Sequence, residues 1–112
     1  MDRTAYLQQI KQHLQTAYLL SPEKTESMLP VFFATLRGHM NQLAELANDG
    51  DMEQLARTSH AVKGALLNMG LMDLAETAYT LEQQSKNGNQ AFDYRALITE
   101  LQYTVTQFDD GF

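Results

Sequence analysis

Apolar residues recur at intervals of three and four along almost the whole chain, a spacing typical of amphipathic helices. Residues 3–20 carry Ile10 and Leu14 on one such stripe, and a later stripe repeats through Leu101, Val105 and Phe108. No segment alternates strictly between apolar and polar residues, so the sequence predicts no strands. We therefore expect an all-α protein.

Turn-forming residues divide the helical segments. Ser21-Pro22 is typical of a helix start, with Ser21 as the N-cap and Pro22 in the first turn. Pro30 should break or kink the helix that follows, because it removes a backbone donor. Asp51 and Gln54 are spaced as in a capping box and predict the start of the next helix.

Further breaks are expected at residues 48–50, at Gly70 and at residues 87–89, with Asp93 as the cap of the last helix. Four or five amphipathic helices joined by short turns favour an up-down antiparallel four-helix bundle. The bundle should have an additional N-terminal helix or short capping helix. With 112 residues, we expect one domain over residues 1–112.

Composition excludes several classes of function. The net charge of −6 disfavours binding to phosphate backbones, so no nucleic-acid partner is expected. No apolar run approaches the roughly 18 residues of a membrane span, and we expect no membrane contact and a cytoplasmic location. The absence of cysteine rules out thiolate metal sites. We expect a monomer, and both a free-standing protein and an excised domain remain open.

Residues 59–70, SHAVKGALLNMG, place a glycine inside a predicted helix, where it costs about 1 kcal/mol relative to alanine. On a helical wheel the core side of this segment is formed by Leu55, Ser59, Val62, Leu66 and Met69. His60 lies roughly 130° from the centre of that side, and Gly64 lies about opposite it. His60 should therefore face solvent, with a gap beside it on the outside of the bundle.

This arrangement suits phosphoryl chemistry. An imidazole in water has a pKa of about 6.5, so it is largely neutral and nucleophilic at pH 7. Such a nitrogen can attack a phosphoryl group and hold it as phosphohistidine. Lys63 is within reach of His60 on a helix and would offset the added charge. His13 and His39 lack this pattern, and we interpret them as ordinary surface histidines.

The stretch His60-Ala61-Val62-Lys63-Gly64-Ala65, followed by Gly70, resembles the signature of histidine-containing phosphotransfer (HPt) domains. These domains are intermediate carriers of multistep two-component phosphorelays. The family pattern is a histidine, any residue, an aliphatic residue, lysine, glycine, a small residue, and a further glycine that closes the helix. The chain matches each of these positions.

The resemblance implies a four-helix bundle in which His60 accepts a phosphoryl group from an aspartate of one receiver domain and passes it to another. It implies that Lys63 orients and neutralises this group, and that Gly64 leaves room for the active site of the receiver. It also implies a carrier with no kinase activity and no cofactor of its own, since Mg²⁺ would come with the partner receiver domain.

A small apolar patch is expected around His60. We interpret Ala56, Arg57 and Leu67 as receiver-docking residues, and we expect a shallow surface without a deep pocket. Transient partners need modest interfaces so that they can separate again.

Two features depart from the family pattern. Leu66 stands where members often have a second small residue, and because it faces the core we expect it to change packing rather than chemistry. Many members carry a glutamine near the phosphohistidine on the following helix, whereas this chain has Glu82, Gln83 and Gln84 in that region. The sequence leaves open which of the three reaches His60. A carboxylate there is expected to repel the phosphoryl group and to shorten its lifetime.

Other functions remain as alternatives. A non-catalytic helical adaptor, or an inhibitor that docks on a kinase without relaying phosphate, would have a similar composition. A metal site is not expected because the chain has no Glu-x-x-His motif. An enzyme is not expected either, because no general base stands beside His60 in the sequence pattern.

Overall fold

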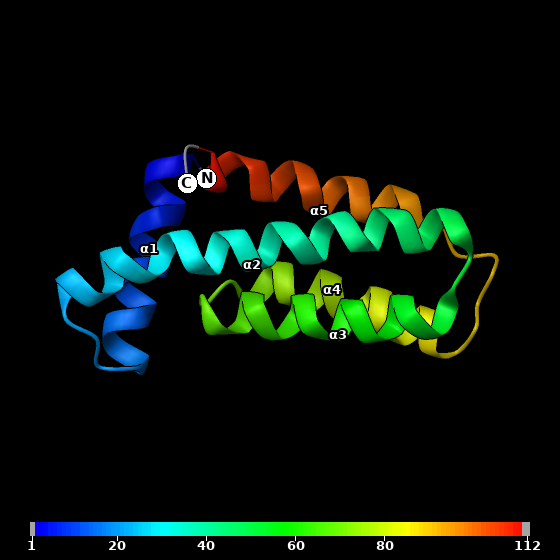
Figure 1. The fold of residues 1–112 in the computed structure, drawn as a ribbon, viewed down its shortest axis with the longest axis horizontal. Coiled ribbons are helices and arrows are strands. Elements are labelled where there is room, and N and C mark those ends of the chain that lie inside the picture. Colours follow the sequence, from blue (N-terminus) through cyan, green and yellow to red (C-terminus); the bar gives the residue numbers. More distant parts are fainter. Residues whose placement is uncertain (1, 111–112) are drawn as a thin grey trace.

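The computed structural model describes residues 2–110, and within them the chain is helical with no strand. The helices are α1 (Arg3–Ala17), α2 (Pro22–Asp49), α3 (Met52–Asn68), α4 (Met72–Lys86) and α5 (Tyr94–Asp109). Helices α2 to α5 run side by side along the long axis with alternating direction, and α1 crosses one end (Figure 1). The predicted four-helix bundle with an additional N-terminal helix is confirmed.

The ends of the helices follow local sequence signals. The side chains of Asp2, Ser21, Asp51 and Asp93 each accept a hydrogen bond from a backbone N–H in the first turn of α1, α2, α3 and α5. Such caps satisfy donors that have no partner inside the helix. The predicted helix starts at Pro22 and after Asp51 and Asp93 are thus confirmed.

Pro30 does not break α2, which continues through it from Pro22 to Asp49. Both Pro30 and Glu26, whose carbonyl loses its intrahelical donor, are solvent-exposed. Water can therefore replace the missing donor. The adjacent Leu29 and Phe33 are fully buried, and their packing holds the helix in place.

The first helix is shorter than predicted. It ends at Ala17 rather than at Leu20, and Tyr18 and Leu19 are exposed instead of continuing the apolar stripe. The cause lies in Pro22, which disfavours helical geometry at Ser21. The chain must therefore reverse direction within the four residues that precede Pro22.

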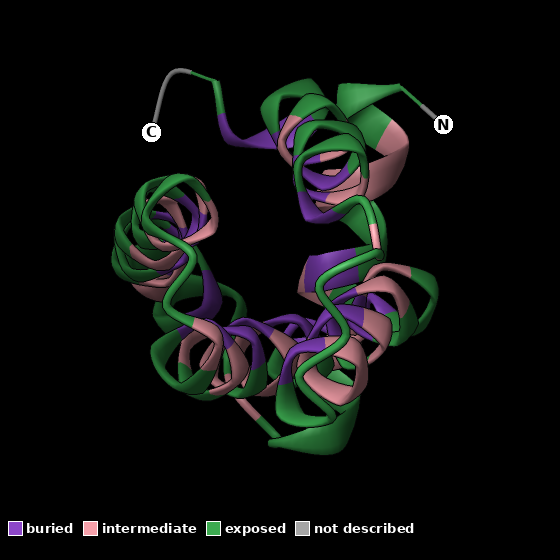
Figure 2. Ribbon diagram, turned by 90° about the vertical axis from the view of Figure 1, so that its right-hand side faces the viewer, coloured by how far each residue is buried: buried purple, intermediate pink, exposed green. Residues whose placement is uncertain are grey.

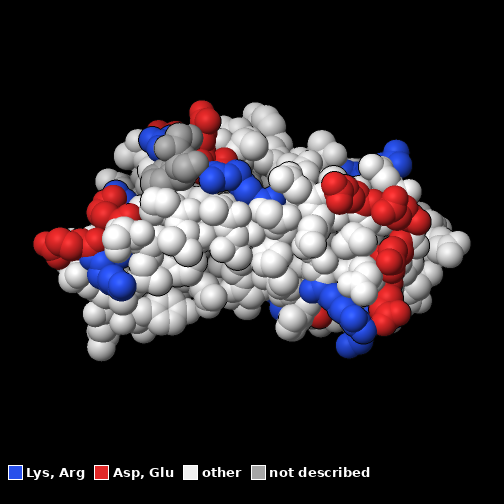
Figure 3. Space-filling model, in the orientation of Figure 1, with Lys and Arg blue, Asp and Glu red and all other residues white. Residues whose placement is uncertain are grey.

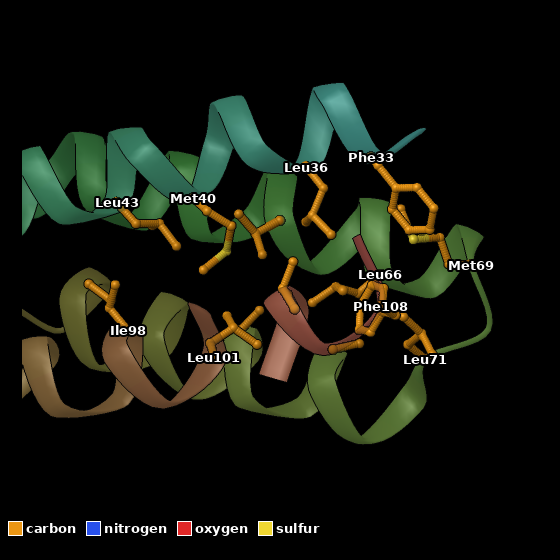
Figure 4. Packing of buried hydrophobic residues seen from close by; sticks show 14 of the residues in the cluster. Phe33, Leu36, Met40, Leu43, Leu66, Met69, Leu71, Ile98, Leu101 and Phe108 are labelled. Carbon is orange, nitrogen blue, oxygen red and sulfur yellow. The ribbon is translucent and has the colours of Figure 1, made fainter. Parts of the chain in front are cut away.

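Buried residues lie on the helix faces that line the inside of the bundle, whereas the outer faces of the helices are exposed (Figure 2). Met40 and Leu43 of α2 point toward Ile98 and Leu101 of α5 (Figure 4). An aromatic cluster closes the end that α1 covers, where the ring of Phe108 lies 4.8 Å from that of Tyr6 and 5.7 Å from that of Phe33. The core thus fixes α1 to the bundle.

Gly70 ends the turn after α3 in a left-handed conformation, with φ of 76°. A Cβ at this position would lie 2.5 Å from Cγ of His13. The glycine is therefore required twice, by its backbone conformation and by the close approach of α1. His13, interpreted from the sequence as an ordinary surface residue, is a half-buried contact between α1 and this turn.

The hydroxyl of Ser59 is fully buried, and it has no hydrogen-bond partner among residues 2–110. We predict that Ser59→Ala raises the free energy of unfolding by about 1 kcal/mol, because an unsatisfied buried hydroxyl is removed. Chemical denaturation measures this. Ser85→Ala is the matched control, since the equally buried Ser85 hydroxyl donates to the carbonyl of Leu81 at 2.6 Å. A higher free energy of unfolding in Ser85→Ala, or a lower one in Ser59→Ala, would contradict the assignment of the Ser59 hydroxyl as unsatisfied.

Candidate functional site

Helix α3 presents His60 to solvent. It buries Leu55, Ser59, Val62 and Leu66 completely on the opposite side. The side chain of His60 remains 67% exposed. The orientation predicted from the helical wheel is confirmed, and it follows from the need of α3 to bury its apolar stripe.

Gly64, one turn after His60, leaves open space on the outer surface of α3. A Cβ built there would meet no other side chain or distant backbone atom of the described residues within 4 Å. No helix of the bundle packs against this glycine, so the bundle itself does not require it. A partner molecule can therefore approach α3 beside His60, as predicted.

Of the three residues left open by the sequence, Glu82 reaches the histidine. Its Oε2 lies 2.9 Å from Nδ1 of His60. The nearby Gln84 instead accepts a hydrogen bond from Nδ2 of Asn89 at 2.7 Å. The glutamate side chain is only 12% exposed, in the seam between α3 and α4.

This contact determines which ring nitrogen of His60 is free. An ionised carboxylate can only accept hydrogen bonds, so Nδ1 must carry the proton that it donates to Glu82. In the neutral ring, Nε2 then holds the lone pair. The exposed nitrogen of the site is therefore the nucleophilic one.

Lys63 shares the same carboxylate. Its Nζ lies 2.9 Å from Oε1 of Glu82, a buried oxygen that forms an ion pair with the ammonium but no well-aligned hydrogen bond. The ammonium also lies 5.0 Å from the ring centroid of Tyr79, within range of a cation–π interaction. Lys63 is thus held between α3 and α4 beside the histidine.

Tyr79 was not singled out from the sequence. It lies three residues before Glu82 on α4, and this spacing places both side chains on one face of the helix. That spacing was the signal available, but it becomes informative only once Glu82 is known to reach the site.

The pKa of Glu82 reflects opposing effects. Burial raises the pKa of this carboxyl, but the close contacts that Lys63 and His60 make with it, together with the positive charge of Lys63, lower the pKa below its ordinary value. Glu82 is therefore ionised at neutral pH, as the assignment of the Nδ1 proton requires. Within residues 2–110, no three His, Asp or Glu side chains gather closely enough to hold a metal ion.

The residues interpreted as docking residues lie on two sides of His60. Ala56 and Arg57 line an open hollow of about 610 Å³ that also borders His60 and Glu82. Leu67, two turns beyond His60 and 40% exposed, is not part of the hollow.

Charge is distributed unevenly around the site. Arg57 pairs with Glu53 at 2.8 Å, near the end of the bundle where α2 passes into α3. Acidic side chains gather at that end, and the middle of the α2–α3 face is largely uncharged (Figure 3).

The tautomer of His60 can be measured directly. We predict that ¹⁵N NMR, recorded above the titration of the ring, finds the proton of His60 on Nδ1. Glu82→Ala should shift the population toward the Nε2–H form, because the acceptor at Nδ1 is lost. Glu82→Gln is the matched control and should keep the Nδ1–H form, since an amide oxygen also accepts. An Nε2–H form in the unaltered protein would show the assignment to be wrong.

A family model described as Hpt domain matches residues 27–111. The match includes α3, α4, α5 and most of α2, and it leaves α1 outside. Comparison with curated proteins and with solved structures found no significant match. None of the helices formed by residues 2–110 has the length and apolar character needed to cross a membrane. The chain belongs to the Hpt domain family, the histidine phosphotransfer domains of phosphorelays.

Proposed function

We propose that this protein is a phosphorelay carrier in which His60 accepts a phosphoryl group from a receiver-domain aspartate and passes it to a second receiver. The observation that carries the proposal is the contact between Nδ1 of His60 and Glu82, which leaves Nε2 unprotonated on an exposed face. A nucleophile that must meet a partner's active site needs both properties.

The transfer step uses the lone pair of Nε2. This nitrogen attacks the phosphorus of an aspartyl phosphate, the new N–P bond forms, and the P–O bond to the aspartate breaks. The electron pair of the broken bond leaves with the aspartate, which becomes a carboxylate. The imidazole ring gains positive charge while its Nδ1–H remains bonded to Glu82. Transfer to the next receiver is the reverse reaction on a different aspartate.

Glu82 and Lys63, which are paired with each other, would balance different charges during transfer. The carboxylate contacts Nδ1, the ring nitrogen away from the phosphoryl group, and stabilises the positive ring. It is itself paired with Lys63, which reduces the repulsion expected from the sequence. The ammonium has three N–H donors. Those that its ion pair with Glu82 does not occupy would be available to phosphoryl oxygens.

The partner supplies the remaining parts of the reaction. Mg²⁺ would be held by the receiver domain, where it neutralises the phosphoryl oxygens during transfer. Ala56, Arg57 and Leu67 would contact the receiver around the histidine, and Gly64 would admit its active site. The carrier needs no cofactor or kinase activity of its own for these roles.

Incubation with a receiver domain phosphorylated on its aspartate tests the proposal. We expect the protein to gain one acid-labile phosphate, detected by intact-mass spectrometry at neutral pH. His60→Gln should gain none, and Lys63→Ala should gain it about ten times or more slowly because a neutralising charge is lost. His39→Gln is the control and should react like the unaltered protein. If receivers of the source organism transfer nothing to the unaltered chain, the non-relaying adaptor or kinase-docking inhibitor becomes the better explanation.

Substitution of Gly64 should separate stability from transfer. Gly64→Ala should raise the free energy of unfolding by about 1 kcal/mol, since the site is helical and the added methyl meets no neighbour. Gly64→Gln should also fold, but its longer side chain should obstruct the receiver and slow transfer more than Gly64→Ala does. Denaturation and transfer kinetics measure the two effects. Transfer at an unchanged rate in Gly64→Gln would contradict the role assigned to this glycine.

A further inference from the structure

Tyr79 of α4 is an exposed aromatic residue that the core does not require. It is 47% exposed, whereas Ala78 and Leu81, on the inner face of the same helix, are fully buried. Its hydroxyl makes no hydrogen bond, and its ring pairs with no other aromatic ring, within residues 2–110. The ring instead lies under the ammonium of Lys63, with 5.0 Å between Nζ and the ring centroid. Packing of the core therefore does not account for a tyrosine at this position.

The contact between Lys63 and Tyr79 lies one step along the bundle from the contact at His60. Lys63 follows His60 by three residues in α3. Tyr79 precedes Glu82 by three residues in α4. The two helices run in opposite directions (Figure 1), so both steps lead the same way along the bundle, by about 4.5 Å. The two contacts are therefore neighbours in the seam between α3 and α4.

The side chain of Lys63 reaches back along this seam toward the histidine. Side chains of a helix tilt toward its N-terminus, and His60 lies on that side of Lys63. Nζ of Lys63 lies 2.9 Å from Oε1 of Glu82, whose other oxygen contacts His60. Within residues 2–110 the ammonium has no second acidic partner. One carboxylate and one aromatic ring thus hold a side chain that is 22% exposed.

A ring and a carboxylate hold an ammonium with different consequences. The face of an aromatic ring attracts a cation through its quadrupole and leaves the positive charge uncancelled. A second carboxylate in place of Tyr79 would neutralise Lys63 and would repel a phosphoryl group. Lysine has a long flexible side chain and loses conformational entropy when it is held in one place. The ring meets part of that cost before a phosphoryl group arrives, and the charge remains available.

We propose that Tyr79 is a positioning residue for phosphoryl transfer, because its ring holds the ammonium of Lys63 in the seam beside His60. This inference rests on the proposed function, and the bonds formed and broken are those of the proposed transfer. When Nε2 of His60 binds the phosphoryl group, the ammonium turns from Oε1 of Glu82 to the phosphoryl oxygens and stays within reach of the ring. The carboxylate keeps its contact with Nδ1–H of the positively charged imidazole.

Replacement of the ring tests this role. Tyr79→Leu should fold, because the position is exposed and leucine is a good helix former. In single-turnover transfer from a phosphorylated receiver domain, we expect its maximal rate constant to fall about threefold to fivefold, the factor that corresponds to one exposed cation–π contact. The receiver concentration that gives half of the maximal rate should not change. Tyr79→Phe keeps the ring and should transfer like the unaltered protein.

A double-mutant cycle tests whether Tyr79 acts through Lys63. In the Lys63→Ala background, Tyr79→Leu should cause no further loss of rate. Tyr103→Leu is the matched control, because Tyr103 is a 69% exposed tyrosine of α5, a helix that carries no residue of the site. It should change neither the maximal rate constant nor the half-saturating concentration.

Proton NMR of the unphosphorylated protein provides a measurement that does not depend on transfer. The Hε protons of Lys63 should be shifted upfield by the ring current of Tyr79. This shift should persist in Tyr79→Phe and disappear in Tyr79→Leu. Equal shifts in all three proteins would show that the ring does not hold the ammonium and would overturn the proposal.

Three kinetic results would also overturn it. They are an equal loss of rate from Tyr79→Leu with and without Lys63, a loss in Tyr79→Phe as large as that in Tyr79→Leu, and a change in the half-saturating concentration alone. The last result would identify Tyr79 as a contact of the receiver. If the unaltered protein receives no phosphoryl group at all, the proposed function itself fails, and this outcome is seen separately in the same assay.

Discussion

The burial of one face of α3 determines the geometry of the site. Leu55, Val62 and Leu66 are fully removed from solvent, and a helix that buries this stripe has only one rotation available about its axis. His60 and Gly64 therefore face outward as a consequence of core packing. The proposed function requires an exposed nucleophile on a rigid support, and the core supplies the rigidity without touching the imidazole.

Glu82 then connects this exposed group to the rest of the bundle. One carboxylate contacts both Nδ1 of His60 and Nζ of Lys63, so α4 orients two side chains of the candidate site on α3. The glutamate is largely buried, and its negative charge is stabilised by the two cationic or proton-donating groups that it positions. From the sequence alone, Glu82 was expected to oppose phosphorylation of His60. In the structure its carboxylate contacts Nδ1 and so favours the tautomer of His60 whose Nε2 is free to react.

Two surface positions depart from the locally most stable choice. Gly64 weakens α3 at a position where a larger residue would clash with no neighbour. Leu19 is exposed and has a positive φ, which is unfavourable for leucine. Ser59 is different, because its unsatisfied hydroxyl lies inside the core and has no evident connection to the partner surface. Local departures from the most stable choice are thus informative about function only when they lie on the surface that a partner can reach.

The sequence by itself determined the helices, the caps at Ser21, Asp51 and Asp93, and the outward direction of His60. These properties depend on residues close together in the chain, whose spacing matches the period of the helix. Only the tertiary structure decided that Glu82, and neither of the glutamines after it, reaches the histidine. Glu82 and Gln84 flank the buried stripe of α4 on different sides, and the side that faces α3 depends on how the helices are arranged around the core. Helical periodicity carries no information about that arrangement, and it did not predict the left-handed turn at Leu19, which results from joining α1 to a helix that starts with proline.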